Sequence, residues 1–140
     1  MADARFEKVQ RSDETLHGPR KILLCGFGRE AQPKFRSVIE MAGLADVPLV
    51  WAAAEDRETL VGDLFERSGG AGEGVGSALP RAVVMAGITE NELHRLMSVC
   101  KRAGMRNALW AALTPTSETW TLEALLGELS AERREMKSKR

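Results

Sequence analysis

Residues 19–27, PRKILLCGF, and residues 80–88, PRAVVMAGI, decide the fold. The second stretch lies 61 positions after the first, and both place proline, a basic residue, apolar residues and glycine in the same order. A short apolar run that is bounded by chain-breaking residues is typical of a buried strand. Each stretch therefore predicts one strand, over 21–25 and 82–86, and the recurrence predicts an internal repeat.

A helix is predicted after each strand, because apolar residues recur there at helical spacing. In the second copy Thr89 and Glu92 have the spacing of a capping box at the helix start. Gly43 and Gly104 follow the two helices at positions suited to a left-handed C-terminal cap. The apolar stripes consist of Phe35, Val38, Ile39 and Ala42 in the first copy, and Leu93, Leu96, Met97 and Cys100 in the second.

Each copy continues with a second apolar segment and a second helix. The segments are 49–53 and 108–113, and each contains a tryptophan, although a small gap is needed to align Trp51 with Trp110. The helix of the second copy begins near Thr121, a residue type that favours the N-cap. Its apolar stripe consists of Leu122, Leu125, Leu126 and Leu129. The shorter helix of the first copy has the stripe Leu60, Val61, Leu64 and Phe65.

We therefore predict an α/β fold in which two tandem β-α-β-α repeats, 19–68 and 80–133, form one four-stranded sheet. Helices would pack on this sheet, and a pseudo-twofold axis would relate the repeats. A right-handed crossover makes the two strands within each repeat parallel. The direction between the repeats stays open, because the intervening residues 69–79 are a glycine-rich flexible linker. Residues 1–18 are predicted to be a flexible tail, and residues 134–140 a charged one.

Composition excludes several classes of protein. The 140 residues carry 20 basic and 20 acidic side chains, which disfavours a strongly basic nucleic-acid clamp. The chain holds no apolar run long enough to span a membrane, and its first residues lack the apolar core of a secretory signal, so we expect a cytoplasmic protein. Cys25 and Cys100 lie far apart and outside any C-x-x-C motif, so we interpret them as reduced, buried thiols.

The sequence Gly26-Phe27-Gly28 begins a G-x-G-x-x-A motif between a predicted strand and a predicted helix. Such a motif can bind the phosphates of a nucleotide, with Arg29 beside it and an acid such as Glu55 or Asp56 after the next strand. The chain is too short for a complete dinucleotide fold, and the second copy has an ordinary turn at this place. We therefore keep a nucleotide- or anion-binding protein or enzyme as the alternative function.

Residues 112–122, ALTPTSETWTL, resemble a signature of the small prokaryotic family known as domain of unknown function 3783. The signature is approximately Ala-x-x-Thr-Pro-x-Asn-x-x-Trp-Thr-Leu-x-x-Leu. The matching residues are Ala111, Thr114, Pro115, Trp120, Thr121, Leu122 and Leu125. Thr116 and Ser117 stand where the family has asparagine, and the spacing to Trp120 differs slightly. The resemblance spans residues 81–133, and it implies a fold unit but no reaction, because the family has no established activity.

The hydroxyl groups of this motif have two interpretations. Thr114, Thr116 and Ser117 can hydrogen-bond the free N–H groups of the following helix, with Trp120 as an apolar anchor. The same hydroxyl and N–H groups could instead form an anion site at the helix N-terminus. We favour the structural interpretation and keep the second one as a candidate ligand site.

The sequence holds no convergent set of catalytic residues, no metal-ligand cluster and no cofactor motif beyond the glycine turn. His17 and His94 have no partners at a recognisable spacing. We therefore predict a non-enzymatic cytoplasmic module that binds a protein partner or a small anionic ligand, with neither nucleic acid nor membrane as partner. A homodimer that forms through an exposed sheet edge is a third possibility.

Overall fold

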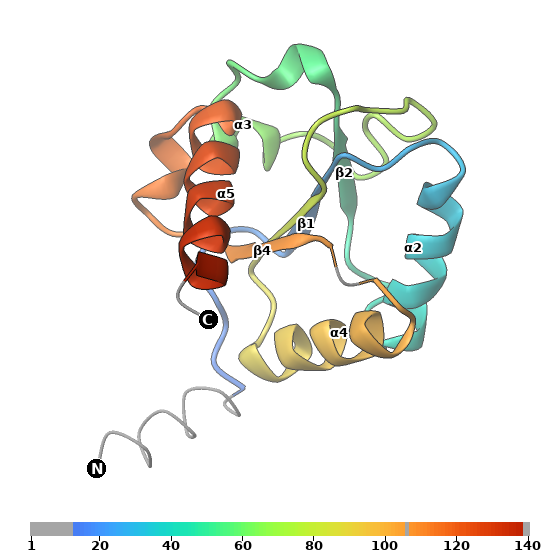
Figure 1. The fold of residues 1–140 in the computed structure, drawn as a ribbon. Helices are drawn as coiled ribbons and strands as arrows, with labels where there is room; N and C mark the ends of the chain where they lie inside the picture. Colours follow the sequence, from blue (N-terminus) through green and yellow to red (C-terminus); the bar gives the residue numbers. More distant parts are fainter. Residues whose placement is uncertain (1–12, 106, 139–140) are drawn as a thin grey trace.

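The four strands form one mixed sheet in the order β2-β1-β3-β4. The computed structural model describes residues 13–105 and 107–138 of the chain (Figure 1). The strands are β1 (Lys21–Cys25), β2 (Leu49–Ala52), β3 (Ala82–Ala86) and β4 (Leu109–Ala112). The strands expected at 21–25 and 82–86 are thus confirmed, and the two later strands begin or end within one residue of the predicted segments.

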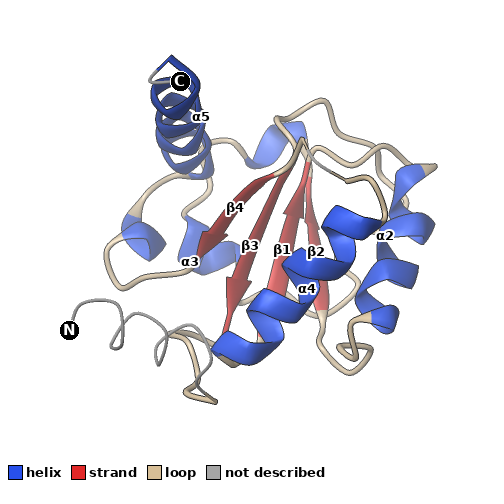
Figure 2. Cartoon of the chain, turned by 60° about the horizontal axis from the view of Figure 1, so that its bottom comes forward, coloured by secondary structure: helices blue, strands red, loops and turns tan. Residues whose placement is uncertain are grey.

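Helices cover both faces of this sheet (Figure 2). One face carries α2 (Ala31–Met41) and α4 (Glu90–Arg102), and the other carries α3 (Val61–Leu64) and α5 (Leu122–Ser138). Two short 3-10 helices, η1 (Ala54–Asp56) and η2 (Ser117–Thr119), follow β2 and β4. In the part of the chain described here, no helix has the length and apolar character that crossing a membrane requires.

The strands are apolar along their whole length because both faces of the sheet are covered. Alternate side chains of a strand point to opposite faces, so Ile22 and Leu24 pack towards α2 and α4, whereas Leu23 packs towards α3 and α5. The two cysteines are both buried and free. Cys25 belongs to the second of these clusters and Cys100 to the first, so the sheet separates their thiols.

The strand register shows how the two halves of the sheet join. β1 pairs with β2 and β3 with β4 in parallel, whereas β1 and β3 are antiparallel, with Leu23 opposite Val84. Ile22 pairs with Leu49, and Val83 pairs with Trp110. Each member of the second pair follows its counterpart by 61 positions, so Trp110 occupies the place of Leu49. The strand pairing therefore matches the two segments without a gap, and in that match Trp51 corresponds to Ala112 and not to Trp110.

The segments that flank the halves take part in backbone hydrogen bonding where they are described. In the expected N-terminal tail, Leu16 donates its N–H to Ile88, and His17 accepts a hydrogen bond from the Gly87 N–H; residues 1–12 lie outside the described part. Within the expected flexible linker, Gly70 and Ala71 hydrogen-bond to the outer edge of β2. Helix α5 continues to Ser138, so the expected charged tail is helical up to that residue, while 139–140 are not described.

Candidate functional site

The two outer edges of the sheet differ in what covers them. On β2, the Gly70 N–H donates to the Leu49 carbonyl at 2.7 Å, and the Trp51 N–H donates to the Ala71 carbonyl at 2.9 Å. All four residues of β2 are buried. A Cβ atom on Gly72 would meet the carbonyl oxygen of Trp51, so glycine is what permits this close approach. The chain thus covers its own β2 edge.

No residue that the structure describes covers the β4 edge in this way. Leu109 and Leu113 donate their N–H groups to Arg81 and Met85, towards β3. Because backbone groups alternate in direction along a strand, Trp110 and Ala112 direct theirs away from the sheet. Within residues 13–105 and 107–138 we find no hydrogen-bond partner for the Trp110 carbonyl or the Ala112 N–H. Three of the four β4 residues, Trp110 to Ala112, are also partly exposed.

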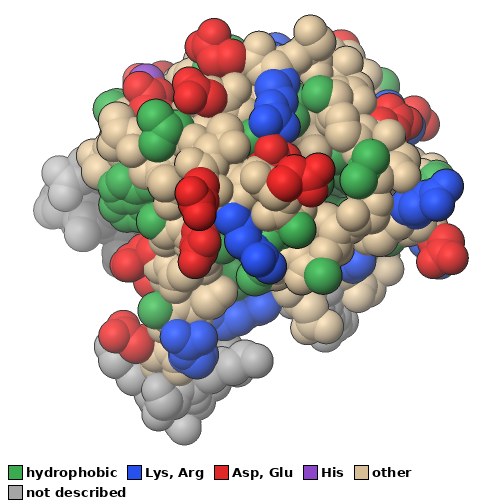
Figure 3. Space-filling model, turned by 90° about the horizontal axis from the view of Figure 1, so that it is seen from above, with side chains coloured by type: hydrophobic (Ala, Val, Ile, Leu, Met, Phe, Trp, Pro, Cys, Tyr) green, Lys and Arg blue, Asp and Glu red, His purple; other side chains and the backbone are tan. Residues whose placement is uncertain are grey.

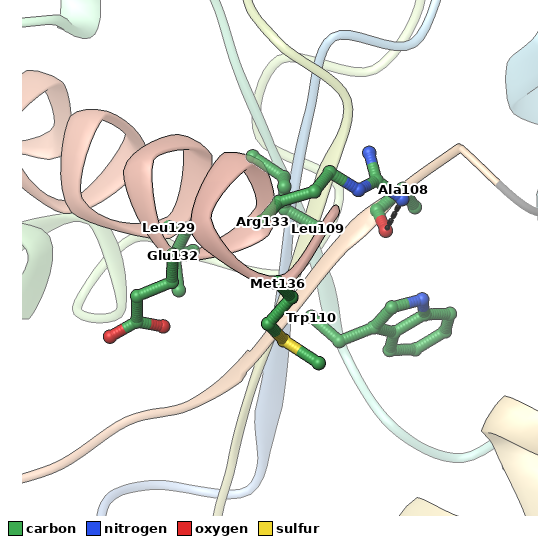
Figure 4. Close-up of a pocket in the computed structure, with 7 residues that line it drawn as sticks. All are labelled: Ala108, Leu109, Trp110, Leu129, Glu132, Arg133 and Met136. Carbon is green, nitrogen blue, oxygen red and sulfur yellow. Dashed lines mark hydrogen bonds between the residues drawn. The ribbon is translucent and has the colours of Figure 1, made fainter. Parts of the chain in front are cut away.

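A groove runs along each side of this open edge. The groove towards α5 has a volume of about 340 Å³, and its walls are shown in Figure 4. Arg133 donates to the carbonyls of Asn107 and Ala108 at 2.9 and 3.2 Å, which fixes α5 over the start of β4. The residues that line this groove are Ala108, Leu109, Trp110, Leu129, Glu132, Arg133 and Met136.

The second groove lies towards α4 and has a volume of about 560 Å³. It shares Trp110, Ala108 and Arg133 with the first groove, so the two grooves meet at the strand. Its α4 wall is formed by Met97, Ser98 and Lys101. Met97 and Met136, one beside each groove, belong to the exposed large apolar side chains of the molecule. The β4 edge therefore combines free backbone groups with an apolar rim.

The glycine turn after β1 is packed against the second half of the chain. Gly26 has a φ of +76°, and a Cβ atom there would meet backbone atoms of Leu79, Pro80 and Arg81. The Arg81 guanidinium lies over the Phe27 ring, 4.6 Å from its centroid. The turn thus places Gly26 at a close backbone crossing, which is the structural reason for a glycine there.

Gly28 and Arg29 lie on the surface beside the start of α2. The N–H groups of Ala31 and Gln32 both point to the Gly28 carbonyl, at 2.9 and 3.2 Å, and Pro33 has no N–H to offer. The Gln32 side chain accepts from the Gly74 N–H and donates to the Val75 carbonyl. The first turn of α2 is therefore occupied by internal contacts.

A cavity of about 480 Å³ nevertheless opens beside Gly28. Lys34 and Arg81 contribute positive charge to its wall, and Glu30 contributes a negative one. On the face drawn in Figure 3, acidic and basic side chains likewise lie side by side. Two positive charges and one negative charge leave the cavity wall with a net positive charge, which favours a small anion.

The hydroxyl-rich motif after β4 is satisfied within its own turn. The Thr114 N–H donates to the Ser117 hydroxyl at 3.1 Å, and the Ser117 N–H donates to the Thr114 hydroxyl at 2.9 Å. The Thr119 hydroxyl donates to the Thr116 carbonyl at 2.7 Å. Trp120 packs against the apolar cluster under α3 and α5, and its carbonyl accepts from the Val61 N–H.

Helix α5 also has partners for its first N–H groups. Leu122 and Glu123 donate to the carbonyls of Thr59 and Arg57, and Ala124 donates to the Thr121 hydroxyl. The two predicted anion sites do not meet, because β1 and β4 run in opposite directions. Gly26 and Gly28 therefore lie at one end of the sheet, and Thr114, Thr116, Ser117 and Trp120 at the other.

Asp56 is held by hydrogen bonds, and the two cysteine thiols are unreactive. Burial acts to raise the pKa of Asp56, but hydrogen bonds from Arg67 and from the Ala53 N–H hold it below its ordinary value. Burial raises the pKa of the Cys25 thiol to about 12, with a further contribution from Asp56, and that of Cys100 to about 11. Both thiols are therefore protonated near neutral pH, and a thiol is a poor nucleophile. Among the described residues, no group of three metal-ligating side chains is present.

Sequence reasoning did not single out most of the β4 site. Trp110 was noted only as the tryptophan of the second apolar segment, and Trp51, the tryptophan of the first segment, is a core residue with 2% exposure. Met97 appeared in a helical stripe, where periodicity cannot separate an exposed margin from the buried centre. The one available indication was the weak strand propensity of the alanine-rich segment 108–112, which suits an edge strand without proving one.

Comparison with known proteins gives one match. The family model described as a domain of unknown function (DUF3783) matches residues 81–136, which extend from the start of β3 into α5 and include both walls of the β4 edge. No curated protein and no solved structure matches the chain. The resemblance noted in the TPTSETWTL segment is thus confirmed, and the C-terminal half of the chain, residues 81–136, is a domain of the family described as DUF3783, a domain of unknown function.

Proposed function

We propose that this chain is a non-enzymatic module that binds a protein by strand addition to the β4 edge. The observation that carries the proposal is the difference between the two sheet edges. At β2, the outward groups of Leu49 and Trp51 are paired with Gly70 and Ala71. At β4, the outward backbone groups of Trp110 and Ala112 have no partner among the described residues, and they lie between two grooves.

Strand addition uses the backbone for affinity and the side-chain pockets for specificity. An added strand would donate an N–H to the Trp110 carbonyl and accept the Ala112 N–H, as Gly70 and Ala71 do at β2. Its side chains would alternate between the α4 groove and the α5 groove, since alternate residues point to opposite faces. An extended segment with small or apolar side chains fits this edge best.

A tandem duplication is the second part of the proposal. The offset of 61 positions relates the pairs at the centre of the sheet, because Leu23 lies opposite Val84. It also relates the exchanged bonds between Val61 and Trp120 and between Leu122 and Thr59, both 2.9 Å long. These agreements support two β-α-β-α repeats about a pseudo-twofold axis. A superposition of residues 21–64 on residues 82–125 in an experimental structure tests this part.

A library of random peptides displayed on phage tests the binding function. Ala112→Pro removes the outward N–H but leaves the bonds to β3, to which Leu109 and Leu113 donate on either side. Ala112→Val is the matched control, since it keeps the N–H. Peptides selected on the wild-type chain should bind Ala112→Val normally and Ala112→Pro about tenfold or more weakly. Equal binding to both variants would exclude strand addition, and protection of the Ala112 amide from exchange provides a measurement without any variant.

An anion site beside Gly28 is the second candidate function. The observation in its favour is the cavity with Lys34 and Arg81 in its wall, and the occupied first turn of α2 counts against it. Titration of the same preparation with inorganic phosphate and ATP, followed by tryptophan fluorescence, separates the candidates. Saturable binding that Lys34→Ala abolishes would favour the anion site over the protein module.

A further inference from the structure

We infer that the occupant of the β4 edge is a second copy of this chain, paired antiparallel about Ala111. The inference rests on the proposed strand addition and names its partner. Trp110 and Ala112 direct their backbone groups outward on either side of Ala111. A twofold axis through Ala111 places Trp110 opposite Ala112 of the second copy. Residues that face each other in this way exchange two hydrogen bonds in an antiparallel pair, so the strand satisfies the free groups of its own image.

The side chains of β4 suit such a pairing. Trp110 and Ala112 point to the same face, because they are two positions apart. The indole of one copy then lies beside the small Ala112 side chain of the other, and Ala111 meets Ala111 on the opposite face. Natural edge strands commonly carry lysine, proline or a bulge that prevents association. The four residues of β4, Leu109–Ala112, include neither a charge nor a proline.

The helices beside the edge favour the same arrangement. The axis runs perpendicular to the sheet, so α4 lies next to α4 of the second copy, and α5 next to α5. The exposed methionines, Met97 at 36% and Met136 at 67% exposure, flank the edge on these two faces. Glu132 and Lys101 provide both signs of charge at the rim, and the chain has no net formal charge to oppose its own association.

The covered β2 edge makes the assembly finite. A chain with two free edges could add further copies without limit, which leads to fibres. Here Gly70 and Ala71 occupy β2, so each copy has one edge to offer, and the association closes at two chains. One open edge and one covered edge in each copy are therefore the arrangement that a closed dimer requires.

Sedimentation equilibrium and a designed disulfide test the inference on the full chain. The wild-type protein should sediment with twice the 15.3 kDa chain mass, and Ala112→Pro with the mass of one chain. In an antiparallel pair without hydrogen bonds, Cα atoms lie about 4.5 Å apart, within the range of a disulfide. Ala111→Cys should therefore form a linked dimer on mild oxidation. Ala45→Cys, an exposed residue beyond the β2 edge, is the matched control and should stay monomeric on a reducing-agent-free gel.

The outcomes separate this inference from the proposed function. A single-chain mass for the wild-type protein, or equal cross-linking of Ala111→Cys and Ala45→Cys, overturns the second copy as partner. Peptide binding that is sensitive to Ala112→Pro would then still support strand addition by another protein. A dimer that persists unchanged in Ala112→Pro overturns the inference as well, because it must form through another surface.

Discussion

At the scale of single residues, one ion pair joins segments that are far apart in the sequence. Arg20 donates two hydrogen bonds of 2.8 Å to the carboxylate of Glu92, and it also contacts Asp46. The same carboxylate accepts from the Thr89 N–H at the start of α4. The bonds from Arg20 lower the pKa of Glu92 to about 2, against the opposing effect of burial. Arg20, which directly precedes β1, thus ties the start of that strand to α4.

Glu92→Gln tests the contribution of this pair. Glutamine keeps an oxygen for the Thr89 N–H, so the variant removes mainly the charge interaction. We expect a loss of about 1–2 kcal/mol in the free energy of unfolding at pH 7. A carboxylate with a lowered pKa stabilises the fold above its unfolded pKa, near 4.5, and loses that contribution as the pH falls towards 2.

Chemical denaturation at several pH values between 7 and 3 measures this difference. The gap between wild type and Glu92→Gln should narrow steadily below pH 4.5. Glu40→Gln, at an exposed position of α2, serves as the control and should leave stability unchanged. A gap that stays constant down to pH 3 would contradict the assignment of the effect to the ion pair.

At the scale of elements, local sequence patterns predicted the structure well. The capping box at α4 is confirmed. The Thr89 hydroxyl accepts from the Glu92 N–H at 3.1 Å, and the Glu92 carboxylate accepts from the Thr89 N–H. The first helix of the other half, α2, lacks a side-chain cap. Among the described α-helices, α3 is the shortest, a single turn of four residues, because its apolar stripe is too short to support a longer helix.

Thr89→Ala tests the cap. Loss of the hydroxyl leaves an N–H of the first turn without its partner, and we expect the free energy of unfolding to fall by about 1 kcal/mol. Thr89→Ser keeps the hydroxyl and should retain most of the stability. Thermal unfolding followed by circular dichroism compares the three proteins, and an equal loss in both variants would mean that the methyl group, not the cap, is responsible.

At the scale of the whole molecule, the glycine-rich segment decides which edge stays open. It runs from the end of α3 to β3 and lies along β2, where Gly70, Ala71 and Gly72 approach the strand closely. The sequence pattern predicted a flexible tether, because glycine and serine dominate the segment. The same glycines, however, permit positive φ angles and backbone contact with Trp51. The segment is therefore positioned by its contacts with β2, which the local sequence pattern does not contain.

Gly72→Ala, compared with Gly74→Ala, tests this cover. Both residues have a positive φ, +79° and +87°, so alanine strains the backbone in either case. Only at Gly72 would the added Cβ meet the carbonyl of Trp51, while the space around Gly74 is open. We expect Gly72→Ala to lose about 1 kcal/mol more stability than Gly74→Ala and to speed amide exchange at Trp51. Equal exchange at Trp51 in both variants would show that the segment does not protect β2.

The candidate site depended on information that local patterns lack. Residues 108–113 were predicted as a strand, and the motif around Trp120 as a helix start, because both follow from periodicity and capping residues within a few positions. That β4 is an outer strand follows only from the order of the sheet, which no single segment encodes. Trp110 and Trp51 look alike in the sequence, yet one lies at the open edge and the other in the core.

The amino-acid sequence by itself determined the strands and helices, because each depends on residues that are close along the chain. It also determined the 61-residue recurrence and the family of residues 81–136, because both are patterns in the order of the residues and need no contact between them. Only the tertiary structure decided that β1 and β3 run antiparallel, that the glycine-rich segment covers β2, and that none of the described segments pairs with the outer side of β4. The physical reason is that a strand's backbone groups are the same whichever neighbour they meet, so the packing of distant segments selects which of them stay unpaired.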